Sequence, residues 1–223
     1  MQYPFSCIPN VLGAIEATMS QARLGRYLPD AKGDKNLALR LYIWNARLCE
    51  EFYLPIQMTE VAVRNGIHRR LSTLYGDNWF AVTRFTDILP DRHKDEIAST
   101  VQTQRERRRA TFAVDHVVAG LSFGFWQNLL GRNHAFVIWK KDAIYESFPH
   151  LPRTLGRDTL YKRVERLRQF RNSVMHHYAI YDKGPSREFS NIRDILGWAC
   201  PESLWLMGEL SNPATVLQRR PQF

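Results

Sequence analysis

Residues 160–178 read LYKRVERLRQFRNSVMHHY and contain the most regular pattern in the chain. Six residues of this segment follow one another at spacings of four and three, so they share one face of a helix. They are Leu160, Val164, Leu167, Arg171, Val174 and Tyr178. Charged and polar residues occupy the opposite face. An apolar stripe opposite a charged face predicts an amphipathic helix that packs against a core.

Stripes of the same kind predict helices over most of the chain. One stripe covers residues 37–52, and Pro55 is expected to restart the chain as the first turn of another helix that ends at Gly76. Further helices are expected over residues 9–23, 90–109, 114–129 and 133–147, with one or two between residues 185 and 210. Strand-like alternation is scarce, so the sequence predicts an all-α fold.

The composition predicts an ordered chain with a cationic surface. Hydrophobic residues make up 44% of the 223 residues, which is enough for a sizeable core. The expected organisation is an N-terminal helical appendage over residues 1–32, a helical domain over 33–210 and a tail over 211–223. The net charge of +9 favours polyanionic partners, either a nucleic acid or an anionic membrane surface.

The membrane alternative is weaker than the nucleic-acid one. The longest uncharged apolar-leaning run, residues 117–126, is far shorter than the roughly 20 residues that span a bilayer. No signal peptide is evident at the N-terminus. Cys7, Cys49 and Cys200 are far apart, which argues against a disulfide framework and a zinc site. These features predict a cytoplasmic protein without a membrane partner, a metal or a cofactor.

Arg171 interrupts the apolar stripe of residues 160–178. A guanidinium on a core-facing row must find an anion or reach solvent, because it cannot lose its proton. Asn172 and His176 are four residues apart and share a side, but His176 lies about 140° from Arg171 on a regular helix. One chain therefore does not aim both groups at one phosphate. A second copy related by a two-fold axis would complete the site, which predicts a homodimer.

These residue types suit the cleavage of RNA by its own 2′-hydroxyl. A neutral imidazole accepts the hydroxyl proton, and an imidazolium returns a proton to the leaving 5′-oxygen. Arg171 can hold the phosphate in a two-pronged manner, and Asn172 can orient the histidine or the ribose. No metal is required. The alternative is a structural arginine, paired with a carboxylate, beside an exposed histidine.

The motif Arg171-Asn172-x-x-x-His176 resembles the signature of HEPN-domain ribonucleases. The blocks WNARL (44–48), FYLPIQ (52–57), EVAVRN (60–65) and LSFGFWQ (121–127) resemble the Abi-like (abortive infection) family. This resemblance implies a HEPN-like helical bundle, a homodimer and a metal-independent endoribonuclease in phage defence or a toxin–antitoxin pair. It also implies Arg171, Asn172 and His176 as catalytic residues. RNA, including transfer RNA, would be the substrate, and an antitoxin or regulator a partner. The alternative is a non-catalytic HEPN-like module that binds RNA or protein.

Several residues are expected to support the motif. We expect Glu60 to anchor Arg171 or Arg64 inside the domain, although a simple surface pair with Arg64 fits the spacing equally well. His177 is expected at the rim of the cleft, or merely exposed, rather than at a metal. Tyr178 is expected in the core. Residues 64–68 echo the motif with a spacing of four instead of five, so His68 is expected to be structural, and this segment to support the site or to contact RNA.

The densest basic run lies near the end of the predicted 90–109 helix. This run is interpreted either as a solvated helix face or as a surface that follows RNA phosphates. It consists of Arg105, Arg107, Arg108 and Arg109, and it is joined by Lys140, Lys141, Lys162, Arg163 and Arg166. The second interpretation predicts RNA binding that weakens steeply with salt.

Overall fold

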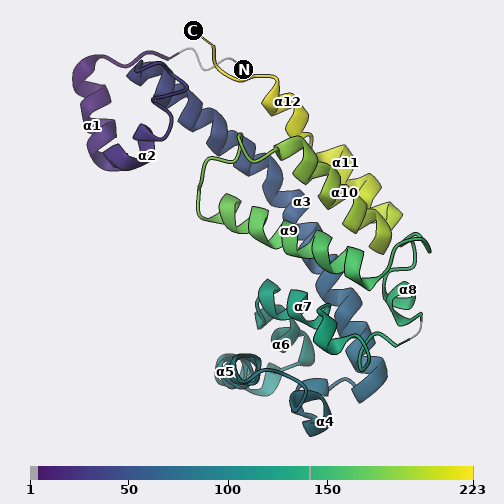
Figure 1. Cartoon of the computed structure of the whole chain (residues 1–223). Helices are drawn as coiled ribbons and strands as arrows, with labels where there is room; N and C mark the ends of the chain where they lie inside the picture. Colours follow the sequence, from purple (N-terminus) through teal and green to yellow (C-terminus); the bar gives the residue numbers. More distant parts are fainter. Residues whose placement is uncertain (1–4, 141, 223) are drawn as a thin grey trace. The chain divides into compact units, whose positions relative to one another are not determined.

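The computed structural model describes residues 5–140 and 142–222, and within these ranges all regular structure is helical, with no strand (Figure 1). The all-α prediction is confirmed. The first helices are α1 (Pro9–Met19), α2 (Gln21–Gly25) and α3 (Lys35–Tyr75). They are followed by η1 (Trp79–Ala81), α4 (Thr83–Thr86), α5 (Asp91–Arg108), η2 (Arg109–Thr111), α6 (Val114–Gly120), α7 (Phe123–Leu129) and η3 (Arg132–His134). The last are α8 (Ala143–Ser147), α9 (Arg157–Met175), α10 (Pro185–Ala199), α11 (Pro201–Leu210) and α12 (Pro213–Leu217).

The chain forms two compact units. The first unit comprises Met1–Ile56, Gln169–Asn191 and Leu206–Phe223, and the second comprises Gln57–Arg168 and Ile192–Trp205. Each boundary between the units falls inside a helix, so α3, α9, α10 and α11 contribute residues to both. The division into 1–32, 33–210 and 211–223 describes segments along the sequence and stays a prediction.

Helix α3 is continuous over 41 residues and contains Pro55, so the predicted restart at this proline is wrong. A proline lacks the N–H that would bond to the carbonyl four residues earlier, here that of Glu51. The Ser211 hydroxyl donates a hydrogen bond of 2.7 Å to this carbonyl oxygen. The Asn212 N–H lies 3.3 Å from Glu51 Oε2. A side chain distant in sequence thus replaces the missing donor, and the helix continues.

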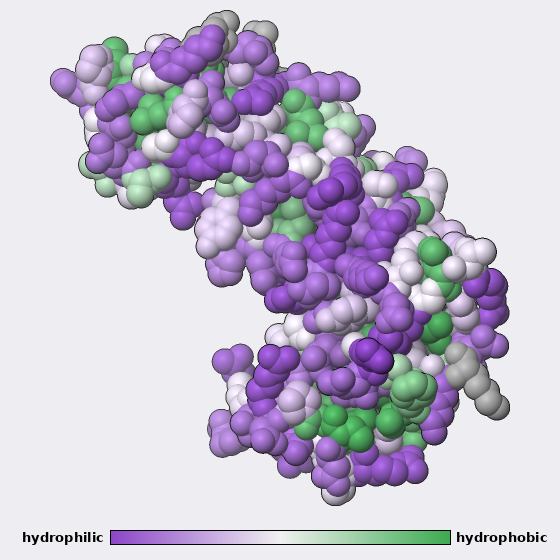
Figure 2. All heavy atoms as spheres, in the orientation of Figure 1, coloured by the Kyte–Doolittle hydropathy of each residue, from purple (hydrophilic) through white to green (hydrophobic). Residues whose placement is uncertain are grey.

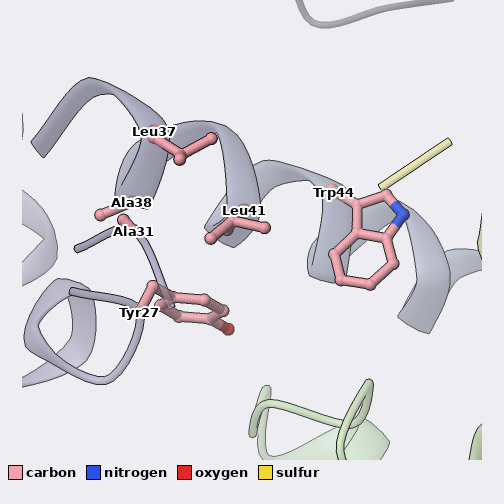
Figure 3. Close-up of a cluster of buried hydrophobic side chains, with 6 residues drawn as sticks. All are labelled: Tyr27, Ala31, Leu37, Ala38, Leu41 and Trp44. Carbon is pink, nitrogen blue, oxygen red and sulfur yellow. The ribbon is translucent and has the colours of Figure 1, made fainter. Parts of the chain in front are cut away.

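The core of the first unit forms around the beginning of α3. The predicted stripe of this helix is confirmed, because its five apolar residues from Leu37 to Phe52 are at most 2% exposed. Leu37 and Leu41 pack with Tyr27 in one buried cluster, and Trp44 lies further along the same helix (Figure 3). Trp44 Nε1 donates to the Val216 carbonyl at 2.7 Å, which attaches α12 to α3.

The expected helix over residues 9–23 consists of α1 and α2, which are separated at Ser20. Ser20 has a φ of 72° and ends α1, while its side chain accepts the Arg23 N–H and begins α2. Leu12 and Leu24 bury their side chains together with Leu39 of α3 in a second cluster of the first unit. The N-terminal segment is therefore packed onto the start of α3.

The core of the second unit is aromatic. The fully buried Trp79 contacts the rings of Phe85 and Trp126 at centroid distances of 5.4 and 5.8 Å. Its indole Nε1 donates a 3.0 Å hydrogen bond to His68 Nδ1. Burial lowers the pKa of His68, which favours the neutral ring that can accept this bond. The structural role expected for His68 is confirmed.

The stripe over residues 114–129 belongs to two helices rather than to the single helix predicted. Helix α6 ends at Gly120, and Ser122 caps α7 by accepting the Phe125 N–H at 3.2 Å. The Ser122 N–H donates to Glu96 Oε1 at 2.8 Å. Phe125 and Leu129 are nevertheless fully buried. Periodicity therefore identified buried residues but not the break between the helices.

The predicted helix over residues 133–147 is also wrong, since the described part of this segment contains only the end of η3 and the short α8. Lys141 lies outside the described residues. Arg70 Nε donates to the Ile138 carbonyl at 2.8 Å, which uses an acceptor that a continuous helix would need. Trp139 Nε1 donates to the Leu129 carbonyl at 2.7 Å. Tertiary hydrogen bonds therefore replace helical ones in this segment.

Within the described residues, we find no helix that combines the length and the apolar character needed to cross a bilayer.

Candidate functional site

The predicted motif lies where α9 ends. Arg171 and Asn172 occupy the last turn of this helix and are half-buried, whereas His176 follows the helix and is exposed. Arg171 Nη1 donates a long hydrogen bond of 3.4 Å to Asn172 Oδ1. The predicted continuation of the helix to Tyr178 is wrong, because α9 ends at Met175.

The end of α9 has the hydrogen bonds of a Schellman motif. The Tyr178 N–H donates to the Ser173 carbonyl at 2.9 Å, and the His177 N–H donates to the Val174 carbonyl at 3.0 Å. His177 occupies the left-handed position between them with a φ of 58°. Glycine usually takes this position, because a side chain there costs about 1–2 kcal/mol. Other contacts must therefore hold His177 in this conformation.

Asn45 of α3 fixes the chain directly after this turn. Its side chain is 3% exposed, and both ends of its amide are used. Nδ2 donates to the Tyr178 carbonyl at 3.1 Å, and Oδ1 accepts the Ile180 N–H at 2.8 Å. Ile180 is fully buried, so its N–H has to be satisfied within the protein. Asn45 therefore determines the path of the chain that leaves the motif.

The N-terminal segment is bound to the same turn. Arg23 Nη1 of α2 donates to the His177 carbonyl at 3.1 Å, and Arg26 pairs with Asp182. The Tyr181 hydroxyl donates to Asp30 Oδ2 at 2.6 Å. Burial, together with this hydrogen bond, raises the pKa of Tyr181 to about 12. Part of the predicted appendage over residues 1–32 thus bonds to the carbonyl of His177, the residue after His176.

A lysine contacts the residues on both sides of this turn. Lys183 Nζ donates to Ser173 Oγ at 3.0 Å and lies 5.6 Å from the centroid of the Tyr178 ring. Sequence reasoning did not single out Arg23 or Lys183. Asn45 was noted only within the WNARL block. Its place beside Trp44 on a buried stripe is the one signal that could have marked it as a buried polar residue.

The turn also changes where the motif side chains lie. Tyr178 was expected in the core, but it is 56% exposed, because the left-handed residue before it takes the chain off the line of the helix. Its ring centroid lies 6.0 Å from that of His176. Helical spacing therefore extends to His176, whose N–H donates to the Asn172 carbonyl at 3.0 Å, but not to Tyr178. An exposed imidazole can exchange protons with a ligand, and an adjacent phenol ring can stack on a base.

The expected supporting residues Glu60 and Arg64 lie on α3 in the second unit, where both are half-buried. Arg64 Nε lies 3.5 Å from Asn65 Oδ1. The anchoring of Arg171 by Glu60 stays a prediction. His177 is exposed, as one of its expected roles required. No group of three or more His, Cys, Asp or Glu side chains within residues 5–140 and 142–222 is placed to hold a metal ion.

The basic residues expected to bind RNA differ in their surroundings. Arg105, Arg107, Arg108 and Arg109 are exposed at the end of α5, and Lys162 is exposed on α9. Arg163 forms an ion pair of 3.1 Å with Asp194 and lies 5.8 Å from the Trp198 ring centroid. Arg166 is half-buried. The α5 cluster is thus the part of this set with the most accessible charge.

Comparisons with protein-family models, with curated proteins and with solved structures give no match to this chain. The resemblance to Abi-like HEPN proteins therefore depends on the quoted motifs alone.

Proposed function

We propose that this chain is a metal-independent endoribonuclease of the HEPN type, with Arg171, Asn172 and His176 as its catalytic residues. One observation carries the proposal. His176 is exposed on a turn with a fixed backbone, one helical turn after Asn172, whose side chain contacts Arg171. A reactive imidazole must reach solvent and have a defined position, and this arrangement meets both requirements.

In the proposed reaction, His176 of one protomer accepts the proton of a ribose 2′-hydroxyl. The 2′-oxygen then attacks the adjacent phosphorus, and the bond between phosphorus and the 5′-oxygen breaks. His176 of a second protomer donates a proton to the leaving 5′-oxygen, so the products are a 2′,3′-cyclic phosphate and a 5′-hydroxyl. Arg171 stabilises the charge on the phosphate oxygens. Because each chain carries one motif histidine, a homodimer is part of the proposal.

The biological setting belongs to the same proposal. The quoted blocks resemble those of abortive-infection proteins, so we infer a cytoplasmic defence effector or toxin that is restrained by an antitoxin or another regulator. The three cysteines are free thiols, which is compatible with a reducing compartment. Transfer RNA is the first substrate to examine, because it is abundant and structured.

The test is an assay of purified protein with transfer RNA and total RNA in the presence of a chelator. We expect cleavage that leaves 2′,3′-cyclic phosphate ends, and we expect His176→Ala to reduce the rate about 10²- to 10⁴-fold. His150→Ala is the matched control, because it removes another exposed histidine that lies outside the motif. Its rate should equal that of the unmodified chain.

Intact RNA in the presence of folded, dimeric protein would contradict the enzyme proposal for these substrates. Expression in cells separates the two functions. If the chain arrests growth and His176→Ala arrests it equally, a non-catalytic binding module explains the effect better. Loss of the arrest in His176→Ala, with retention in His150→Ala, supports catalysis.

A further inference from the structure

The end of α5 carries a dense cluster of arginines. We define the arginine turn as residues 105–112, which contain Arg105, Arg107, Arg108 and Arg109, all of them exposed. Within the described part of the chain, none of these four guanidiniums forms an ion pair with a carboxylate. The acidic residue among them, Glu106, instead accepts a 2.9 Å hydrogen bond from Gln102 Nε2. Four positive charges within five residues are therefore exposed to solvent.

The backbone of the arginine turn is held in place. The Arg109 N–H donates to the Arg105 carbonyl, and Thr111 Oγ1 donates to the Arg108 carbonyl at 2.8 Å. Arg109 has a φ of 48°, a conformation that is costly for a residue with a side chain. The Phe112 N–H bonds to the Arg109 carbonyl at 3.2 Å. The turn is thus ordered before any ligand binds.

Packing beneath the turn adds to this order. The Arg105 guanidinium lies 5.4 Å from the centroid of the Phe112 ring, which restricts it while leaving its N–H edge available. Helix α6 approaches α5 so closely that a Cβ on Gly120 would lie 2.7 Å from Thr100 Cγ2. Helix α6 therefore packs against α5 from Thr100 to Gln104, directly before the arginine turn.

Helix electrostatics alone do not account for the cluster. Cations near a helix C-terminus are favourable by about 0.3–1 kcal/mol each, which explains one or two basic residues. Four guanidiniums within five residues repel one another, and Glu106 places only one negative charge among them. All four are arginines, whose planar N–H pairs match the oxygens of a phosphate. Hydrophilic residues cover the face of the molecule over α5 (Figure 2).

We propose that the arginine turn is a binding surface for the phosphates of RNA, separate from the residues that cleave it. The choice of RNA as the polyanion rests on the proposed function. The phosphate chemistry itself rests on the four guanidiniums and their fixed backbone. The surface contacts phosphates rather than bases, so binding is weakly selective for sequence.

The test measures RNA binding without cleavage. The full chain with His176→Ala is titrated with a fluorescent 24-nucleotide single-stranded RNA at several salt concentrations. A second protein carries Arg→Gln at positions 105, 107, 108 and 109 in addition. For a single-stranded nucleic acid, the logarithm of the binding constant falls with the logarithm of the salt concentration, with a slope of about 0.7 for each phosphate that the protein neutralises. Loss of four arginines should therefore reduce the magnitude of this slope by about 3. At the lowest salt, Kd should rise at least about tenfold.

The matched control removes the same charge elsewhere. It carries Gln in place of the exposed residues Arg92, Arg132, Arg187 and Arg219, also with His176→Ala. Its slope should change by less than about 1, because long-range attraction alone contributes little at moderate salt. Equal losses in the control and the arginine-turn variant would overturn the proposal. So would an unchanged slope in the arginine-turn variant, provided that its circular dichroism and melting temperature match the control.

Two results distinguish a failure of this binding surface from a failure of the proposed nuclease. If the unmodified chain cuts no RNA but the slope depends on the arginine turn, the binding surface stands and the nuclease fails. If the unmodified chain cuts RNA and the slope does not depend on the turn, the nuclease stands and the binding surface fails. If the arginine-turn variant loses binding to phosphatidylserine vesicles while the salt dependence of its RNA binding is unchanged, the turn binds a membrane surface and the proposal is overturned.

Discussion

The turn at His177 in the first unit and the arginine turn in the second unit are stabilised in different ways. Around the turn at His177, and at Pro55 of the same unit, side-chain bonds come from far away in sequence. Ser211 bonds to the Glu51 carbonyl across 160 residues, Asn45 to Tyr178 across 133 and Arg23 to His177 across 154. The arginine turn uses bonds to residues three and four positions away.

This difference has a consequence for the two candidate functional regions. The turn that presents His176 has its shape only when three distant segments are assembled. The arginine turn receives most of its shape from its own residues. Substitutions that remove one long-range bond should therefore disturb the motif turn strongly, whereas the arginine turn should tolerate the loss of one local bond.

The largest effect is expected for Asn45→Ala. This change leaves the carbonyl of Tyr178 and the buried N–H of Ile180 without their partners, at about 1–3 kcal/mol for each group. We expect the free energy of unfolding, measured with urea, to fall by about 2–4 kcal/mol. Under conditions where the variant is still folded, RNA cleavage should fall as well, because His176 loses its defined position.

Asn36→Ala is the matched control for Asn45→Ala. Asn36 also lies on α3 and also uses both ends of its amide, on the Cys7 N–H at 2.7 Å and the Cys7 carbonyl at 3.3 Å. It is half-buried, so its loss should cost only about 0.5–1.5 kcal/mol, and cleavage should be unchanged. Equal effects of the two substitutions on stability and cleavage would contradict a special role for Asn45.

A smaller effect is expected for Ser211→Ala, about 1–3 kcal/mol of unfolding free energy, because the Glu51 carbonyl loses its donor. The Pro55→Ala background provides the sharper test. An alanine at position 55 has the N–H that the helix needs, so Ser211→Ala should then cost less than about 0.5 kcal/mol. The same cost in both backgrounds would show that Ser211 does not compensate for Pro55.

Glycine substitutions at His177 and Arg109, the residues with a positive φ in the two turns, should stabilise the protein slightly. His177→Gly and Arg109→Gly each remove a cost of about 1–2 kcal/mol, which the greater freedom of glycine in the unfolded chain offsets in part. We expect a gain of about 0.5–1 kcal/mol, equivalent to a rise in Tm of about 1–4 °C. His177→Val and Arg109→Val are the controls, and both should lower Tm. A lower Tm for either glycine variant would show that the histidine or arginine side chain contributes more than its backbone costs.

The smallest effect is expected for Thr111→Val. This change removes the hydrogen bond to the Arg108 carbonyl, but the carbonyl lies at an exposed helix end, where water can replace the hydroxyl. The free energy of unfolding should change by less than about 0.5 kcal/mol. A loss as large as that of Ser211→Ala would mean that the arginine turn is not locally determined.

Much of the fold follows from patterns that lie within single helices. The stripe from Leu37 to Phe52 marks residues that are buried in the structure, and the ends of α3 at Gly76 and α5 near Arg109 fall where they were predicted. The arginine run is equally visible along the chain. The motif residues could be chosen by type and spacing, but the turn that exposes His176 could not be foreseen.

The helical class, most of the buried faces and the candidate motif could be predicted from the sequence, because periodicity and residue type are properties of neighbouring positions. The continuation of α3 through Pro55, the end of α9 at Met175 and the exposure of Tyr178 became evident only in the folded chain. Each of these outcomes depends on a hydrogen bond or a backbone conformation that is stable only when partners such as Ser211 and Asn45 are brought together by folding. Sequence spacing within a helix carries no information about such partners.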